Sequence, residues 1–318
     1  MGKSPARLLC ALAFCAAALP SRAEAPKVVA SIQPIHSLVA SVMQGVAEPG
    51  LVVSGAQSEH TYALKPSDAR LLQAAQVVVM VDEGYETFLA KPLKGRKASL
   101  DVIAMADLPG ATTLPPRAGG AGEDEHGGLD HDKGHGKGHA HGHDHGAIDG
   151  HVWLDPGNAR LLVTAVAERL SELDAANAER YRANAHATVA RLEALDDQLR
   201  RQLAPVAGKP FVVFHDAYQY VERRYGLAAA GSITVDPDRP PSAKRLAILR
   251  DRLKAAGAAC VFREPQFPAP VVKTLAEAAG AREGVLDPQG ADIPPGPDQY
   301  FTLMTRLGDG LASCLDGK

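Results

Sequence analysis

The sequence has few aromatic residues, no excess of basic residues and no long apolar segment apart from one near the N-terminus. Aromatic side chains make up 5% of the chain, too few for the stacking surfaces that bind single-stranded nucleic acid. The formal net charge is −3, so the chain also lacks the basic surface that follows a phosphate backbone. We therefore expect no nucleic-acid partner. Beyond the N-terminal run, no apolar segment is long enough to form a membrane helix.

The first 25 residues have the pattern of a secretory signal peptide. Lys3 and Arg7 precede the short apolar run Leu8–Leu19, which is too short to remain as a membrane anchor. Pro20 ends this run, and small residues follow at suitable cleavage positions as far as Ala25. The pattern predicts export to the periplasm.

Cysteine is scarce, and its four positions exclude a lipid anchor. Cys10 and Cys15 lie inside the apolar run, and neither follows the small residue that a lipid-attachment signal requires. Export would place the remaining pair, Cys260 and Cys314, in an oxidising compartment. We predict a disulfide between them, which would stabilise the fold by roughly 4 kcal/mol on the chain-entropy model. The alternative is a cysteine-based zinc site, but the chain has no CxxC pair.

Short apolar runs alternate with helix-like stretches in two separate parts of the chain. The run Val77–Val81 is apolar throughout, which is typical of parallel strands covered on both faces. The expected strands are 27–31, 51–55, 77–81 and 99–105 in the first part, and 211–215, 229–235, 259–263 and 283–286 in the second. This alternation predicts an α/β fold with a small parallel sheet, flanked by helices, in each part.

Two helical patterns lie between these parts. Their apolar stripes are Leu162, Val166, Leu170 and Leu173, and then Val189, Leu192, Leu195, Leu199 and Leu203. The second belongs to an uninterrupted pattern at 178–203, which we interpret as a long rigid helix joining two lobes. A coiled coil is the alternative, but the repeat is short. The expected division is a signal peptide at 1–25, an N-terminal lobe at 26–157, a helical segment at 158–204 and a C-terminal lobe at 205–318.

Residues 119–150 interrupt the first part with a segment rich in glycine, histidine and aspartate. Almost no apolar residue occurs in it, so we expect a mobile, disordered loop. Its histidines are His126, His131, His135, His139, His141, His143 and His145. Tracts of this kind bind metal weakly at several positions. The alternative is a solvated linker of chance composition.

Three further histidines lie where chemistry is expected in such a fold. His60 follows the second expected strand, His151 follows the His-rich loop, and His215 ends a strand of the second lobe. Open α/β sheets bind ligands beyond the carboxyl ends of their strands, and three imidazoles with a carboxylate or water suit Zn²⁺. Glu59 and Asp287 are the candidate carboxylates. From spacing alone, structural roles for these histidines are equally compatible with the sequence.

The order of several motifs resembles that of the zinc-specific solute-binding proteins of ABC importers, the ZnuA group. The matching segments are Glu59-His60-Thr61-Tyr62, Lys65-Pro66-Ser67-Asp68, the His-rich loop, His151-Val152-Trp153-Leu154-Asp155-Pro156, Phe214-His215-Asp216-Ala217-Tyr218, Arg263-Glu264-Pro265-Gln266-Phe267 and Leu286-Asp287-Pro288. They span essentially the whole mature chain. The resemblance implies two lobes joined by a rigid helix, with a metal ion at their interface and no enzymatic activity.

The resemblance also implies a ligand set and partners. His60, His151 and His215 would bind Zn²⁺ as the transported ligand, and a membrane permease would receive it. Members of the group complete the site with the glutamate beside the first histidine, with water or with a late aspartate, and the Ser-Glu-His order favours Glu59 over Asp287. Manganese-binding relatives have a carboxylate where this chain has His215, which favours zinc. We further expect a monomer, a periplasmic zinc chaperone as a second partner, and a His-rich loop that assists zinc acquisition.

Two other functions compete with this interpretation. An exported metallohydrolase needs an open coordination position and a positioned general base. Glu59 is a nominal base, but the HExxH motif is absent. A surface adhesin would need the lipid anchor that the cysteine positions exclude.

Overall fold

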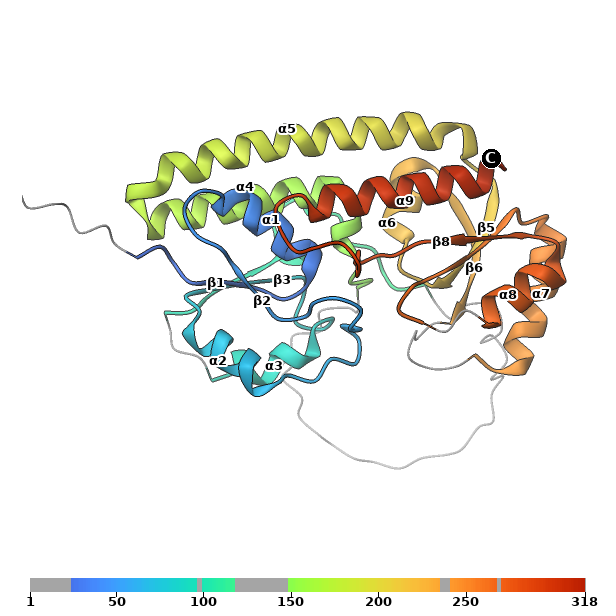
Figure 1. The fold of residues 1–318 in the computed structure, drawn as a ribbon, viewed down its shortest axis with the longest axis horizontal. Helices are drawn as coiled ribbons and strands as arrows, with labels where there is room; N and C mark the ends of the chain where they lie inside the picture. Colours follow the sequence, from blue (N-terminus) through green and yellow to red (C-terminus); the bar gives the residue numbers. More distant parts are fainter. Residues whose placement is uncertain (1–23, 96–98, 118–147, 235–240, 268–269, 318) are drawn as a thin grey trace, which may run out of the picture.

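A computed structural model describes residues 24–95, 99–117, 148–234, 241–267 and 270–317 of the chain. The predicted signal peptide, as far as residue 23, and residues 119–147 of the predicted His-rich loop lie outside these ranges. The described chain forms two α/β lobes, each with a four-stranded parallel sheet, and a long helix runs along both (Figure 1). The predicted fold class is therefore confirmed.

The N-terminal sheet has the strand order β2-β1-β3-β4. Its strands are β1 (Val28–Ala30), β2 (Gly50–Leu51), β3 (Val77–Met80) and β4 (Asp101–Ala104). All pairs are parallel, and β3 is buried at every position, as its continuous apolar run predicts.

The C-terminal sheet repeats the same topology, with the order β6-β5-β7-β8. Its strands are β5 (Pro210–His215), β6 (Ala228–Thr234), β7 (Cys260–Arg263) and β8 (Arg282–Val285), all parallel. Because the carboxyl ends of parallel strands share one edge, each lobe presents one edge at which ligand-binding side chains can gather.

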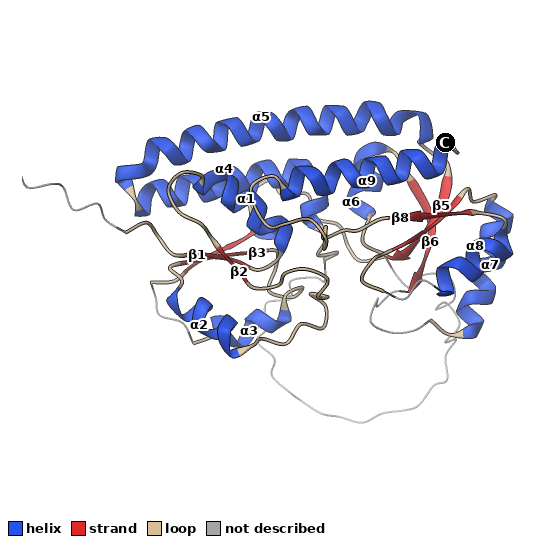
Figure 2. Ribbon diagram, viewed as in Figure 1, coloured by secondary structure: helices blue, strands red, loops and turns tan. Residues whose placement is uncertain are grey.

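Helices connect and cover the strands (Figure 2). In the N-terminal half they are α1 (Gln33–Met43), α2 (Pro66–Ala74), α3 (Thr87–Leu93) and α4 (Pro156–Leu173). They are followed by α5 (Ala178–Leu203), α6 (Gln219–Tyr225), α7 (Ala243–Ala256), α8 (Pro270–Ala279) and α9 (Gln299–Asp316). No helix in the described ranges combines the length and apolar composition needed to cross a bilayer.

The main hydrophobic core continues from one lobe into the other. Alternate residues of β5 divide between two apolar clusters, because successive side chains of a strand point to opposite faces. Phe211 and Val213 join the large cluster that includes β1, β3, α4, α5 and α9, whereas Val212 and Phe214 join a smaller one under α7 and α8. The shared cluster fixes the two lobes to one another through buried apolar contacts.

Two helices, α5 and α9, extend along both lobes (Figure 1). The sequence predicted α5 as a rigid linking helix. It did not predict that α9 also connects the two lobes. Tyr300, near the start of α9, donates its backbone N–H to the Ser37 hydroxyl of α1 at 2.9 Å. Gly308 lets α9 approach α5 closely, since a Cβ there would lie 2.5 Å from a methyl group of Leu199. The domain boundaries remain a prediction, and α9, which lies beyond the last boundary, packs against α1 and α5, which lie before it.

A disulfide joins Cys260 of β7 to Cys314 of α9, with Cα atoms 6.1 Å apart. The predicted bond is therefore present. It attaches the C-terminal helix covalently to the second sheet. Because the same helix also packs against α1 and α5, the bond strengthens one end of the link between the lobes.

Candidate metal centre

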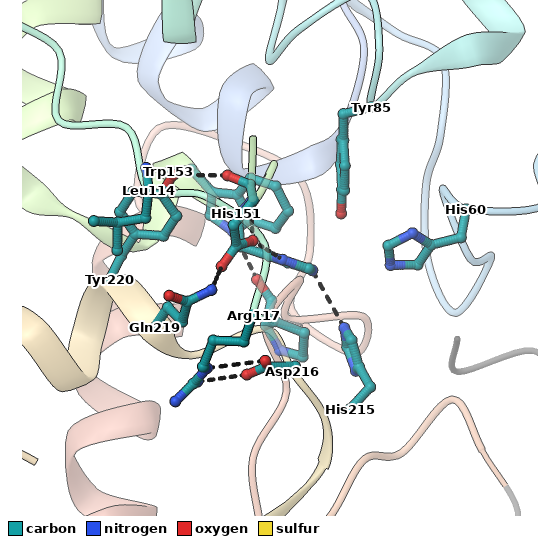
Figure 3. Close-up of polar contacts among 12 residues, drawn as sticks. His60, Tyr85, Leu114, Arg117, His151, Trp153, His215, Asp216, Gln219 and Tyr220 are labelled. Atoms are coloured by element: carbon teal, nitrogen blue, oxygen red, sulfur yellow. Dashed lines mark hydrogen bonds and ion pairs between the residues drawn. The ribbon is translucent and has the colours of Figure 1, made fainter. Parts of the chain in front are cut away.

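Three histidines from separate parts of the chain meet between the lobes. His60 lies in the segment between β2 and α2, His151 precedes the short 3₁₀ turn Val152–Leu154, and His215 is the last residue of β5. The two latter side chains are almost fully buried, whereas His60 is 24% exposed. The sequence predicted these three positions, and the structure brings all of them together (Figure 3).

The three rings form a nearly equal-sided triangle. Ring centroids are 5.7 Å apart for His60 and His151, 5.6 Å for His60 and His215, and 5.2 Å for His151 and His215. One nitrogen from each ring lies within 4.8 Å of the other two. This spacing allows one cation to contact all three imidazoles after small side-chain adjustments.

A carboxylate fixes the orientation of His215. Both oxygens of Glu264 lie 2.8 Å from Nδ1 of His215, and the Tyr218 hydroxyl donates to Glu264 Oε1 at 3.1 Å. Burial alone would lower the pKa of His215, but the charge of Glu264 and its hydrogen bond outweigh burial and raise it. Nδ1 therefore carries a hydrogen, and Nε2 is the nitrogen that faces the other rings.

A second carboxylate fixes His151 in the same way. Asp149 Oδ1 lies 2.7 Å from Nδ1 of His151 and also accepts its backbone N–H at 3.1 Å. The Gln219 side chain donates to the other oxygen of Asp149 at 3.1 Å, and the Tyr220 hydroxyl donates to the Asp149 carbonyl at 2.7 Å. Helix α6 thereby anchors the segment that presents His151, next to the strand end that presents His215 (Figure 3).

Glu59 lies beside the triangle, close to His60. Its Oε1 is 3.6 Å from Nε2 of His60 and accepts a hydrogen bond of 2.6 Å from the Tyr85 hydroxyl. Burial would raise the pKa of Glu59, but His60, Tyr85 and His151 together outweigh burial and lower it. Gly150 permits this position of Tyr85, because a Cβ there would lie 2.1 Å from the ring. Glu59 is not among the groups within 4.8 Å of one another, so its predicted role as a ligand is untested.

Asp287, the other candidate carboxylate, has a different environment. Its Oδ1 accepts from Gln266 Nε2 at 2.7 Å and from the backbone N–H groups of Gln289 and Gly290 at 2.9 Å. Its Oδ2 accepts the backbone N–H of Ala291 at 2.7 Å. These bonds organise the loop after β8. Like Glu59, Asp287 is absent from the compact group of metal-binding side chains, so its role as a ligand is also untested.

Sequence reasoning missed three residues of this centre. Asp149 fell inside the predicted mobile loop 119–150, yet it is buried, and its N–H is bonded to the Leu114 carbonyl at 2.8 Å, so the prediction is wrong for that end of the segment. Glu264 stood in a matching motif without an assigned role. Tyr85 had no signal, because its contact with Glu59 spans 26 positions. The histidines at 126–145 lie outside the described residues.

The model of a protein family described as "ZnuA: Zinc-uptake complex component A periplasmic" matches residues 28–314 of the chain. The chain belongs to this ZnuA family. The family is a class of solute-binding transport proteins and not of enzymes. The predicted recognition is thus confirmed over nearly all of the described chain.

Known relatives agree with this membership. The chain is 46% identical, over 95% of both chains, to the high-affinity zinc uptake system protein ZnuA of Brucella abortus (strain 2308). It is 38% identical, over 98% of both, to the protein so described from Paracoccus denitrificans (strain Pd 1222). A crystal structure of ZnuA superimposes with a TM-score of 0.73 at 27% identity, over 92% of this chain and 99% of that one. A zinc-bound ZnuA structure that lacks residues 138–173 of its own numbering superimposes with the same score, over 91% of this chain and 98% of that one.

Proposed function

We propose that this chain captures Zn²⁺ in the periplasm and delivers it to the permease of an ABC importer, with His60, His151 and His215 as the metal ligands. The observation that carries the proposal is the convergence of the three imidazoles, two of which direct Nε2 inward because Nδ1 bonds a carboxylate. Imidazole nitrogen is a preferred ligand of Zn²⁺, whereas Mn²⁺ prefers oxygen. Membership in a family described as a periplasmic component of a zinc-uptake complex supports both the compartment and the permease partner.

Glu59 is our candidate for the fourth ligand. Its position next to His60 and its lowered pKa keep a charged oxygen at the edge of the triangle. The Tyr85 hydroxyl orients one of its oxygens, as hydrogen-bonded partners commonly do for carboxylates that bind metal. Water is the alternative fourth ligand.

Metal analysis combined with competition titration tests the proposal. Protein purified without a chelator should contain zinc, and His60→Ala, His151→Ala and His215→Ala should each weaken zinc binding by more than the roughly 10–100-fold that loss of an outer partner costs. His186→Ala is the matched control, because His186 is exposed on α5 and outside the triangle. Unchanged affinity in any one of the three variants would remove that histidine from the ligand set.

The finer expectations about partners belong to the same proposal. We expect the chain to act as a monomer and to exchange zinc with a periplasmic zinc chaperone. Light scattering during size exclusion, with and without zinc, measures the first. Zinc transfer between purified proteins measures the second.

A further inference from the structure

Two buried carboxylates, Asp149 and Glu264, lie directly behind the imidazoles of the centre. Asp149 is 6% exposed and Glu264 is 1% exposed. In the described part of the chain, neither carboxylate contacts a lysine or an arginine. Their partners are the two imidazoles and the neutral side chains of Tyr218, Gln219 and the nearby backbone. Buried charges of one sign are unfavourable unless an opposite charge compensates them.

A neighbouring carboxylate shows the contrast. Asp216 follows His215 directly, and it is paired with the guanidinium of Arg117, which also bonds Glu222 (Figure 3). Asp216 therefore has a cationic partner within the protein, which it shares with Glu222. Asp149 and Glu264 have no lysine or arginine beside them in the described residues. Each bonds one imidazole on the side away from the point where the three rings converge.

We propose that Asp149 and Glu264 are specificity-determining residues that make the centre prefer a divalent cation over a monovalent cation of similar soft chemistry, such as Ag⁺ or Cu⁺. Neutral imidazoles bind both kinds of ion and cannot distinguish them by charge. A divalent ion together with the two carboxylates sums to zero charge, whereas a monovalent ion leaves one negative charge buried. If Glu59 is counted as well, the net charge of the site becomes more negative by one with either ion. The divalent ion still leaves less uncompensated charge, so it is still preferred.

The inference predicts unequal losses when one carboxylate is neutralised. The Coulomb energy of a carboxylate with a monovalent ion is half of that with a divalent ion at the same distance. If the lost charge in Glu264→Gln weakens Zn²⁺ binding by roughly 10–100-fold, the size of loss usual for such partners, the same lost charge should weaken Ag⁺ binding by about the square root of that factor. The ratio of the two affinities should therefore change by roughly 3–10-fold. A change of ring orientation affects both ions and cancels in the ratio.

The experiment measures the dissociation constants of Zn²⁺ and of Ag⁺, in chloride-free buffer, for the full chain and for Glu264→Gln and Asp149→Asn. Both ions are titrated into the same preparation of each variant. Unfolded molecules then lower the stoichiometry and leave the ratio of the two dissociation constants unchanged. Glu264→Asp retains the charge and should keep the wild-type ratio even if both affinities fall. Asp216→Asn is the matched control, because it removes a carboxylate of the same strand end that contacts Arg117 and no imidazole.

This inference rests on the proposed zinc site, and the two can fail separately. Wild-type protein without a tight zinc site would refute the proposed function. Tight zinc binding whose Zn²⁺-to-Ag⁺ ratio is the same in Glu264→Gln, Asp149→Asn and the wild type would refute the charge selectivity alone. An equal change of the ratio in Asp216→Asn would also overturn it, because a diffuse field would then be responsible.

Discussion

His151 and His215 face one another through their Nε2 atoms, which lie 3.2 Å apart. Nδ1 of each ring already bonds a carboxylate. A hydrogen bond between the two Nε2 atoms needs one hydrogen, so one ring carries hydrogens on both nitrogens and is positively charged in the absence of metal. The geometry leaves open which ring this is, but Glu264 raises the pKa of His215 despite the opposing effect of burial, which favours His215 as the ring that takes up a proton. A metal ion that binds both rings must displace this proton.

Zinc affinity should therefore decrease as the pH falls, and the decrease should begin above pH 6.5. The reason is that protonated histidine does not bind metal, and the pKa of His215 is raised above its ordinary value of 6.5. Competition with a chelator of known affinity, measured at several pH values from about 5 to about 8, tests this. Constant affinity over that range would contradict a site made of imidazoles.

The stability of the metal-free protein should depend on pH in the opposite direction. A raised folded-state pKa stabilises the fold fully below the unfolded value of 6.5, and this stabilisation is lost as the pH rises through the folded-state pKa. The difference in melting temperature between the wild type and His215→Asn should therefore shrink between pH 6 and pH 8, roughly the range over which histidine titrates. A difference that grows over this range would mean that His215 is not the protonated ring.

The position of Asp149, at the C-terminal end of the His-rich segment, determines how much of this segment can be deleted without loss of the tight zinc site. Removal of residues 119–146 should abolish weak zinc binding and leave one tight site, because the three proposed ligands lie outside it. A deletion of residues 119–150 should weaken the tight site as well, since it also removes Asp149, which orients His151. Isothermal titration with zinc distinguishes the two. Loss of the tight site in the shorter deletion would reverse the assignment of the sites.

Reduction of the disulfide should destabilise the fold without removing the metal site. The bond joins β7 to α9, and neither sulfur belongs to the histidine group. Its loss should lower the free energy of unfolding by about 4 kcal/mol, measured by denaturant titration, while one zinc per chain is retained. Free-thiol titration of untreated protein should detect none. Loss of zinc on reduction alone would indicate that sulfur participates in binding.

Much of the fold was predictable because local patterns determine it. The linking helix follows from an unbroken amphipathic pattern, and its observed bounds, Ala178–Leu203, are those predicted. Predictions were less accurate where an element ends. Residues 51–55 were expected as a strand, but β2 is only Gly50–Leu51, because its partner β1 stops at Ala30 and the chain turns into α1. Leu173 was placed on the same apolar stripe as the buried Leu162, Val166 and Leu170, but it is 39% exposed because it is the last residue of α4.

The three candidate histidines were predictable, but the residues around them were not. Strand exits and the family motifs indicated His60, His151 and His215. The supports of these rings depend on contacts between distant segments, such as Glu264 with His215 across 49 positions. No local pattern encodes such a contact. Asp149 was obscured because the composition beside it predicts a loop. Its hydrogen bonds with Leu114, His151, Gln219 and Tyr220 nevertheless hold it in the centre.

X-ray absorption at the zinc edge, on the 1:1 zinc complex of the chain lacking residues 119–146, tests the central claim most directly. The account predicts a four-coordinate ion with three imidazole nitrogens at about 2.0–2.1 Å and one oxygen at about 2.0–2.2 Å. The imidazole scattering should fall by one ring in each of His60→Ala, His151→Ala and His215→Ala. Fewer than three imidazoles in the unsubstituted complex, or a sulfur ligand, would contradict it.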